Sequence, residues 1–413
     1  MKYKQWPRVK IAELCELIVD CVNKTAPSVD YETPYKMIRT PNIKGGRINL
    51  MGCRYVEKET FKKWTRRATV DKGDVLLTRE APMGEVGYVD FTDTVFLGQR
   101  IMQYRADPKK LDSAYLLYSF LSPDLQYQFR RHDSTGSIVS HIRVPDCSKF
   151  EISLPSLDEQ KKIANILRGI DKKIDLNNCI NAELEAMAKT LYDYWFVQFD
   201  FPDANGKPYK TSSGKMVYNA TLKREIPASW TVQTLSQIAN ITMGQSPAGE
   251  SYNEERSGTL FFQGSTDFGW LFPTPRQYTT SPARMAQKGD ILLSVRAPVG
   301  DMNIANADCC IGRGLAALNS KSHSDGFLFY VMKYFKQVFE RRNAEGTTFG
   351  SMTKDDLHSL QVVCPEPGLL KRYDGIVSEY NKMIFTRSLE NQDLIKLRDL
   401  LLPLLMNGQV TVK

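Results

Sequence analysis

The 413-residue chain is poor in the residues and motifs that most catalytic and metal sites need. It has four histidines and eight cysteines, and the cysteines form no CxxC pair, so a Cys/His metal site is not expected. No GxxxxGK[ST] sequence is present, which excludes a P-loop, and no GxGxxG turn or GxSxG elbow offers a cofactor site or a serine nucleophile. The absence of any Pro-Pro dipeptide excludes the Asx-Pro-Pro-aromatic motif of amino-methyltransferases. This pattern is typical of a binding protein and not of a catalyst.

Long apolar runs and a strong charge of one sign are also missing. The most apolar stretch, Leu400–Met406, is short and contains Pro403, so no segment is expected to span a bilayer. The first ten residues contain no apolar signal-peptide core and the thiols are scattered, which favours a reduced, cytoplasmic protein. Lys and Arg total 55 against 47 Asp and Glu, and the resulting net charge of +8 permits an acidic partner such as nucleic acid without requiring one.

The sequence repeats itself once. KGDVLLTREAPMGE at 72–85 returns as KGDILLSVRAPVGD at 288–301, with eight identical residues at an offset of 216. Flanking blocks also match, Trp6 with Trp230 at an offset of 224 and Pro155 with Pro365 at an offset of 210. An offset that is constant within each block and decreases between blocks indicates two copies of one fold whose loops differ in length.

Each copy begins with a mixed segment of short apolar runs separated by Gly and Pro. Runs such as VLLT and EVGYVDF in copy one and ILLS and MNIA in copy two predict strands. SAYLLYSFL in copy one and GFLFYVMKYFKQVF in copy two each predict a helix. The expected fold class is therefore α+β, with two pseudo-repeated mixed α/β domains.

A long helix follows each mixed segment, and its apolar residues recur every seven positions. The first helix runs from Asp158 to about Val197. Its stripe contains Ile163, Ile170, Leu184 and Leu191, then Ile166, Ile180, Met187 and Tyr194 three positions later, widened by Leu167, Ile174, Ala188 and Trp195. The stripe of the second helix contains Tyr373, Tyr380, Leu394 and Leu401, then Ile376, Met383, Leu397 and Leu404.

Both stripes are polar at their middle. Lys173, Asn177 and Asn181 interrupt the first, and Arg387, Glu390 and Asn391 interrupt the second. About 40 residues make a helix of roughly 60 Å, too long for one small domain to cover. We therefore expect an antiparallel coiled coil whose polar mid-points face each other and fix its register. The alternative, in which each helix packs only on its own globular unit, stays open.

Clustered cations and amides mark where nucleic acid could bind, because phosphates need cations and base edges need forked or amide side chains. Gly-rich turns beside them would let the backbone approach a duplex closely. The DNA-binding candidates are Arg39, Lys44, Arg47, Arg66, Arg67, Arg130, Arg131 and His141 in copy one, and Gln263, Ser265, Arg296, Arg313, Arg341 and Arg342 in copy two. A solvated charged surface is the alternative role for each of them.

These features together resemble one known family. Two copies hold KGD[VI]LL followed by AP.G, the first long helix opens with SLDEQKKIANIL, and it closes with LYDYWFVQFDFPDANGKPYKTSSGKMV. Over essentially the whole chain this is similar to the specificity (S) subunit of type I restriction-modification systems. The second copy departs from the pattern, since Leu369-Leu370 stand where the family usually has Glu-Gln.

The resemblance implies two target recognition domains, separated by an antiparallel pair of conserved helices, that each read one half of a bipartite double-stranded DNA site. It implies that the helix pair sets the spacing and docks two modification (methyltransferase) subunits, joined by restriction subunits in the full complex. Those partners would carry S-adenosylmethionine, ATP and Mg²⁺ and act as an adenine-N6 methyltransferase and endonuclease, while this chain would be non-catalytic and bind no cofactor or metal.

The expected boundaries are 1–155 for the first recognition domain, 156–200 for the first conserved helix, 201–225 for an exposed linker, 226–365 for the second recognition domain and 366–413 for the second helix. The residues expected in the helix pair and in subunit docking are Ile163, Ile166, Ile170, Asn177, Leu184, Leu191, Ile376, Met383, Leu394, Leu397 and Leu401. A structural adaptor with duplicated protein-binding domains is the alternative function. It would explain the duplication and the helices but not the clustered arginines.

Overall fold

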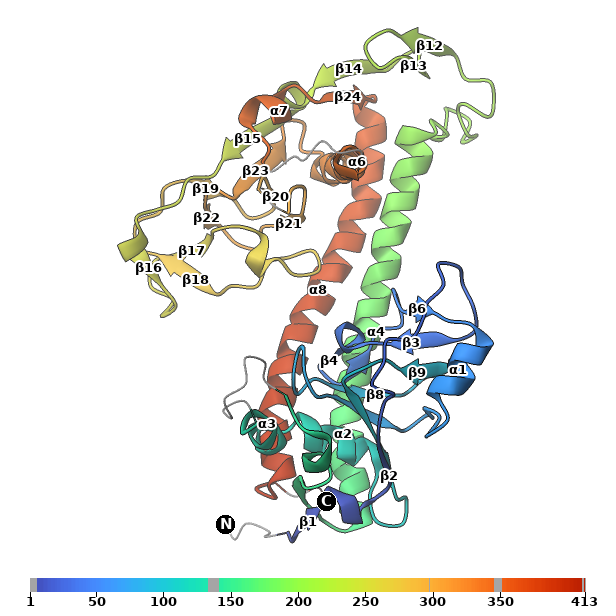
Figure 1. Ribbon diagram of the computed structural model, residues 1–413. Helices are drawn as coiled ribbons and strands as arrows, with labels where there is room; N and C mark the ends of the chain where they lie inside the picture. The colour runs from blue at the N-terminus through green and yellow to red at the C-terminus, as the bar shows by residue number, and fades with distance from the viewer. Residues whose placement is uncertain (1–5, 133–140, 297, 345–350, 411, 413) are drawn as a thin grey trace. The chain divides into compact units, whose positions relative to one another are not determined.

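The structure, a computed structural model, describes residues 6–132, 141–296, 298–344, 351–410 and 412, and for 337–344 it describes the backbone alone. The chain divides into two compact units, and each is described by itself. Unit 1 consists of Met1–Asp175 and Asp393–Lys413, and unit 2 of Leu176–Gln392. Each unit therefore contains one copy of the repeat together with part of both long helices (Figure 1).

Unit 1 is built on a four-stranded antiparallel sheet in the order β2-β10-β7-β8, formed by β2 (Cys15–Asp20), β10 (Ile101–Ala106), β7 (Val75–Thr78) and β8 (Val86–Tyr88). A second sheet, in the order β6-β3-β9, contains β6 (Arg54–Tyr55), β3 (Lys36–Ile38) and β9 (Val95–Leu97), and β3 and β9 run parallel. Two antiparallel pairs complete the strands: β1 (Arg8–Lys10) with β11 (Glu151–Ser153), and β4 (Ile43–Lys44) with β5 (Arg47–Ile48). The short helices are α1 (Lys58–Trp64), α2 (Ser113–Leu121) and α3 (Pro123–Arg130).

Unit 2 repeats this arrangement. Its four-stranded sheet has the order β15-β23-β20-β21, formed by β15 (Ala239–Met243), β23 (Leu315–Ser320), β20 (Ile291–Ser294) and β21 (Met302–Ile304). A five-stranded sheet follows the order β16 (Tyr252–Asn253), β18 (Gln277–Thr279), β17 (Thr259–Phe262), β22 (Cys309–Ile311) and β19 (Met285–Ala286), with β17 and β22 parallel. β14 (Thr231–Thr234) pairs with β24 (Gln361–Cys364), and the helices are α5 (Leu235–Ile238), α6 (Asp325–Ala344) and α7 (Lys354–His358). The predicted α+β duplication is confirmed.

The repeated KGD sequence supports the centre of each sheet. Gly73 and Gly289 have φ values of +99° and +98°, a conformation that glycine adopts without steric cost. The aspartates that follow are buried and accept hydrogen bonds from turn amides, Asp74 from Asp71 N–H at 2.7 Å and Asp290 from Gln287 N–H at 2.8 Å. Because all four residues of β7 and of β20 are buried, the repeat encodes a turn into a central strand.

The long helices are α4 (Leu157–Tyr192), continued by a π-helix over Asp193–Val197, and α8 (Pro367–Met406). They run side by side and antiparallel in both units (Figure 1). In unit 1, Ile163 and Leu167 of α4 share a core with Leu405 near the end of α8. In unit 2, Tyr373 near the start of α8 donates its hydroxyl to the Ala188 carbonyl of α4 at 3.1 Å. The predicted antiparallel helix pair is confirmed.

The segment between the copies, predicted as an exposed linker over 201–225, contains ordered structure. Met216–Asn219 (β12) and Arg224–Pro227 (β13) form a hairpin, and Phe201 stacks on Tyr209 with ring centroids 4.6 Å apart. Aromatic contacts order this segment because Phe201 also stacks on Trp230, which belongs to the unit 2 core. Among the described residues, no helix combines the length and apolarity that a membrane crossing requires.

Candidate nucleic-acid interface

Three loops meet beside the parallel strand pair of unit 1, and we call them the copy-one cluster: residues 38–42, 79–81 and 98–100. Gly98 N–H donates to the Ile38 carbonyl and Arg79 N–H to the Arg100 carbonyl, both at 2.8 Å. Thr40 Oγ1 donates to the Ala81 carbonyl at 2.8 Å. Main-chain hydrogen bonds therefore connect the three loops and fix where their side chains start.

The same loops meet in unit 2 as the copy-two cluster: residues 262–264, 295–296 and 312–314. Gly312 N–H donates to the Phe262 carbonyl at 2.8 Å and Val295 N–H to the Gly314 carbonyl at 2.9 Å. These two bonds match the copy-one bonds one for one, so Gly312 stands where Gly98 stands and Gln263 where Arg39 stands. The position shared by Arg39 and Gln263 has the offset of 224 that the Trp6 and Trp230 block shows.

The two glycines are required by close backbone contact. A Cβ at position 98 would lie 2.9 Å from the Ile38 carbonyl oxygen, and one at position 312 would lie 2.9 Å from the Gln263 carbonyl oxygen. Such contacts are shorter than real Cβ atoms make, so any side chain at these positions would push the loops apart. Each glycine therefore belongs to the support of its cluster.

The two clusters carry different side chains at matching positions. In copy one, Arg39 is half-buried, and within the described part of the chain its buried Nε has no hydrogen-bond partner. Arg100, exposed, pairs with Glu80 at 3.2 Å. In copy two, the exposed Gln263 donates from Nε2 to Ser246 Oγ at 2.9 Å, and Arg313 N–H donates to the same oxygen at 3.2 Å. At the position that Arg39 and Gln263 share, copy one thus has a guanidinium and copy two an amide, and the copy-two cluster also contains the exposed Arg296 and Arg313.

The structure brings only some of the predicted DNA contacts into these clusters. Arg39, Gln263, Arg296 and Arg313 belong to them, Ser265 follows directly in a turn, and His141 is exposed next to Ile142, whose N–H donates to the Arg79 carbonyl at 2.9 Å. Lys44, Arg66, Arg130 and Arg131 are exposed but lie on other elements, the β4–β5 hairpin and the ends of α1 and α3. The side chains of Arg341 and Arg342 lie outside the described residues.

Two of the predicted cations are held by carboxylates. Arg67 pairs with Asp20, and Arg47 lies against α4, with its Nη2 2.7 Å from Asp175 Oδ1 and 3.9 Å from Asp171 Oδ1. The DNA contact predicted for Arg47 stays a prediction, but its guanidinium, 45% exposed, also pairs with carboxylates of the helix. Cluster members that sequence reasoning missed are Arg79 and Arg100, which the repeat offsets could have located. Ser246, outside the copy-two cluster, was also missed and accepts hydrogen bonds from Gln263 and Arg313.

The mid-helix polar residues pair as expected. In unit 2, Asn177 is 1% exposed and donates from Nδ2 to Glu390 at 2.8 Å and to Asn391 Oδ1 at 2.9 Å. Asn391 in turn donates to Asn178 Oδ1 at 2.9 Å. Polar groups that pair inside a helix interface favour one register, since a shifted pairing would remove these hydrogen bonds. Asn177 therefore lies in the contact between α4 and α8, and its role in fixing the register stays a prediction.

One half of the predicted stripe is displaced by one residue on each helix. Ile163, Ile170 and Leu184 are buried as expected and Leu191, Leu394 and Leu401 are half-buried, but Ile166, Ile376, Met383 and Leu397 are 36%, 37%, 41% and 43% exposed. The buried positions are instead their C-terminal neighbours, Leu167, Val377 and Ile384, with Arg398 half-buried. Spacings of three and four residues alternate in a heptad, and most of the predicted positions have an apolar neighbour. The sequence pattern therefore fits a stripe shifted by one residue as well as the correct one.

Comparison with known proteins agrees with this architecture. The family model of the type I restriction modification DNA specificity domain matches residues 3–186 and 227–368, once on each copy. A protein named as the specificity subunit of the type I restriction enzyme MjaX of Methanocaldococcus jannaschii is 30% identical over 425 residues, which cover 99% of this chain and 95% of that protein. The HindI specificity subunit of Haemophilus influenzae is 20% identical over 407 residues, covering 83% and 88%.

A solved S subunit of a type I restriction-modification system from M. genitalium has the same fold, with a TM-score of 0.60 at 18% identity, covering 98% of this chain and 96% of that chain. The two matched ranges make up more than half of the sequence. The chain therefore belongs to the family of type I restriction modification DNA specificity domains. Its role is that of a DNA specificity subunit of a type I restriction-modification system, as the resemblance in the sequence predicted.

Proposed function

We propose that the copy-one and copy-two clusters each read one half of a bipartite double-stranded DNA site. The observation that carries this proposal is that the same three loops are built twice on matching main-chain hydrogen bonds, with different side chains at the matching positions. A duplicated support with unequal side chains is what two readers of unequal half-sites need.

The chemistry of the matching positions supports different bases for the two halves. A guanidinium such as that of Arg39 can donate two hydrogen bonds to O6 and N7 of guanine. An amide such as that of Gln263 can bond N6 and N7 of adenine as a donor and an acceptor. Exposed cations on other elements, such as Lys44, Arg66 and Arg130, are suited to phosphates, which position a protein without reading sequence.

The helix pair is proposed to set the gap between the half-sites and to dock two modification subunits. Support comes from the apolar side chains of Ile166, Ile376, Met383 and Leu397, which the helix pair leaves partly exposed. Apolar side chains repeated on a helix face are suited to packing against a partner helix. This assigns to the exposed half of the stripe the subunit-docking role that the sequence predicted for it.

The chemistry of the assembly is proposed to lie in the partners. In this proposal the modification subunits carry S-adenosylmethionine and methylate adenine N6, and restriction subunits add ATP- and Mg²⁺-dependent cleavage in the cytoplasm. The chain itself binds none of these cofactors and supplies recognition and assembly. The family membership supports this division of labour.

An exchange of the two matching residues tests the proposal. Arg39→Gln and Gln263→Arg variants are each expressed with the modification subunit, and methylated adenines are mapped across a genome. We expect one bipartite motif for the wild type, with Arg39→Gln altering bases in one half and Gln263→Arg altering bases in the other. Lys109→Gln, exposed in the turn after β10, is the matched control and should leave the motif unchanged.

Two outcomes would contradict the proposal. A contiguous wild-type motif would remove the two-reader arrangement, and a variant that changes both halves would show that the clusters do not act separately. Salt-independent association with a protein partner, without methylation of any DNA site, would favour the structural adaptor instead.

A further inference from the structure

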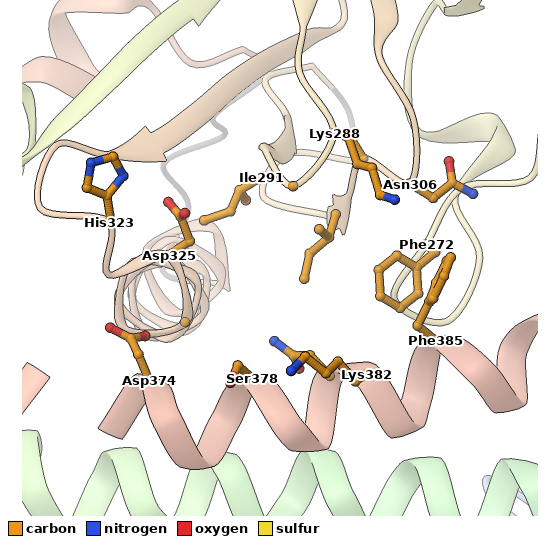
Figure 2. A pocket seen from close by; sticks show the side chains of 15 residues that line it. Phe272, Lys288, Ile291, Asn306, His323, Asp325, Asp374, Ser378, Lys382 and Phe385 are labelled. Atoms are coloured by element: carbon orange, nitrogen blue, oxygen red, sulfur yellow. The ribbon is translucent and has the colours of Figure 1, made fainter. Parts of the chain in front are cut away.

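Each copy has a cavity where its mixed α/β domain meets a long helix. In unit 1 a cavity of about 240 Å³ is lined from the helix side by Arg168, Asp171, Lys172 and Asp175 of α4. In unit 2 a cavity of about 390 Å³ is lined from the helix side by Ser378, Asn381, Lys382 and Phe385 of α8, together with Asp374 at its far end (Figure 2). The first four residues of each set lie 210 positions apart, which is the offset between the two helices.

The loops opposite the helices also match. Tyr88 N–H donates to the Gly46 carbonyl at 3.1 Å, and Ile304 N–H, 216 positions later, donates to the Leu271 carbonyl at 2.8 Å. Gly46 and Leu271 therefore occupy the same place in the two copies, and so do the residues after them, Arg47 and Phe272. The loop that contains Arg47 in copy one and Phe272 in copy two thus faces matching helix positions in both copies. Its offset of 225 differs from the offsets of the repeated sequence blocks.

The contact made at this place is ionic in copy one and aromatic in copy two. Arg47 lies 2.7 Å from Asp175, and Asp171 beside it also accepts the Tyr118 hydroxyl at 2.6 Å. Phe272 packs on Phe385 with ring centroids 4.7 Å apart and planes at 65°, and Figure 2 shows the two rings together at one end of the cavity. Phe272 replaces Arg47, and Phe385 replaces Asp175, as a pair.

We propose that Arg47 and Phe272 are positioning residues that clamp the two recognition domains to their helices by different physical means. The inference rests on the proposed function, because the seat of each domain on its helix sets where its loop cluster meets DNA. Neither residue reads a base in this proposal. Arg47 acts through α4, and Phe272 acts through α8.

The chemistry of the two clamps gives them different responses to salt. The side chains of Arg47 and Asp175 are 45% and 55% exposed, so added salt screens their attraction. An edge-to-face aromatic pair has no net charge to screen and stays in place as salt rises. The copy-one clamp should therefore loosen with ionic strength, while the copy-two clamp should not.

Hydrogen exchange of the full chain at 50 and 500 mM NaCl tests the clamps without any DNA. We expect amides of 43–48 to exchange about two- to fivefold faster at high salt, the range that an exposed ion pair supports, and amides of 268–274 to change little. Arg47→Ala should exchange fast at 43–48 at both salt concentrations. The double variant Arg47→Phe/Asp175→Phe, which installs the copy-two pair in copy one, should make the exchange independent of salt.

Arg8→Ala is the matched control, because Arg8 and Asp124 form an ion pair in the same unit with 41% and 48% exposure. It should leave exchange at 43–48 as in the wild type. Equal exchange at 43–48 in Arg47→Ala and Arg8→Ala would overturn the clamp, and so would salt-dependent exchange at 268–274 of the same size as at 43–48. Arg47→Ala alone suffices for this decision if the double variant does not fold.

Methylation by the assembled complex separates a clamp from a DNA contact. A loosened clamp should retain the bases of both half-sites, and methylation of sites whose gap is one base pair longer or shorter should rise several-fold relative to the normal site. If Arg47 contacted a phosphate, Arg47→Ala would instead weaken binding to all sites together and lower the slope of log affinity against log salt by about one. That outcome would overturn the proposal for Arg47. If the wild-type complex methylates no bipartite site, the proposed function fails while the exchange results still decide the clamp.

Discussion

The polar layer of the helix pair makes a quantitative prediction. Asn391 is 8% exposed, accepts a hydrogen bond from Asn177 and donates one to Asn178. Asn391→Leu removes both bonds while keeping a side chain of similar size. It leaves an N–H of Asn177 without a partner beside an Asn177 Oδ1 that already has none among the described residues. We therefore expect this single substitution to destabilise unit 2.

The expected size follows from the burial of the orphaned group. A buried polar group left without a partner costs about 1–3 kcal/mol. With a urea slope of about 2 kcal/mol per M, the unfolding midpoint should fall by about 0.5–1.5 M. The double variant Asn177→Leu/Asn391→Leu removes both polar partners and the unpaired carbonyl with them, so most of the loss should be regained, at the expense of a defined register.

Tryptophan fluorescence can follow unit 2 selectively during urea unfolding. Trp195 and Trp230 are 6% and 5% exposed in the unit 2 core, and Trp6→Phe with Trp64→Phe removes the two tryptophans of unit 1. Asn177→Leu alone completes a double-mutant cycle in the same background. A double variant whose loss equals the sum of the single losses would refute the reasoning, because it would show that the two asparagines do not depend on each other.

Three further substitutions have defined outcomes. Burial raises the pKa of Asp374, so the charged form is disfavoured in the folded state. The unfolding free energy of the wild type should therefore fall, relative to that of Asp374→Asn, as the pH rises from about 3.9 through the raised pKa. Equal pH profiles of the two proteins would contradict this. Asp74 is 1% exposed and accepts hydrogen bonds from Nε and Nη2 of Arg105, both at 2.8 Å. Asp74→Ala should therefore lower the free energy of unfolding of unit 1 by about 3 kcal/mol, and Asp74→Asn by less, as measured by thermal or chemical unfolding. A Cβ at position 98 or 312 would push the loops of its cluster apart, so Gly98→Ala should impair recognition of one half-site and Gly312→Ala recognition of the other. The measurement is methylation of sites that carry a mismatch in one half-site. Identical effects of the two variants would count against separate clusters.

The sequence predicted those features that depend on periodicity and identity. The KGD repeat located the two central strands, and the heptads located α4 and α8 with their polar middle. Ile163, Ile170 and Leu184 were placed correctly because they lie at the centre of the apolar stripe. These features are local, since each depends on residues within a few turns of one helix or within one turn and strand.

The features that the sequence missed depend on contacts between distant segments. Ile166 and Leu167 are both apolar, and only the partner helix decides which of them is buried. The ion pair of Arg47 could not be predicted because its carboxylate partner Asp175 is more than a hundred residues away in the chain. The equivalence of Phe272 to Arg47 could not be predicted from the sequence, because it is seen only in matching backbone hydrogen bonds and not in any shared residue.

The way the loop clusters are joined has a consequence for how this protein can change over evolutionary time. The bonds that connect the three loops of each cluster run mainly from main chain to main chain, through Gly98 and Ile38 in one copy and Gly312 and Phe262 in the other. The side chains at 39, 99, 263 and 313 take no part in those bonds. Point substitutions there can alter the surface offered to a ligand while these main-chain bonds stay in place. If the clusters read DNA as proposed, single substitutions at these positions are expected to change the bases read without a compensating change elsewhere in the fold.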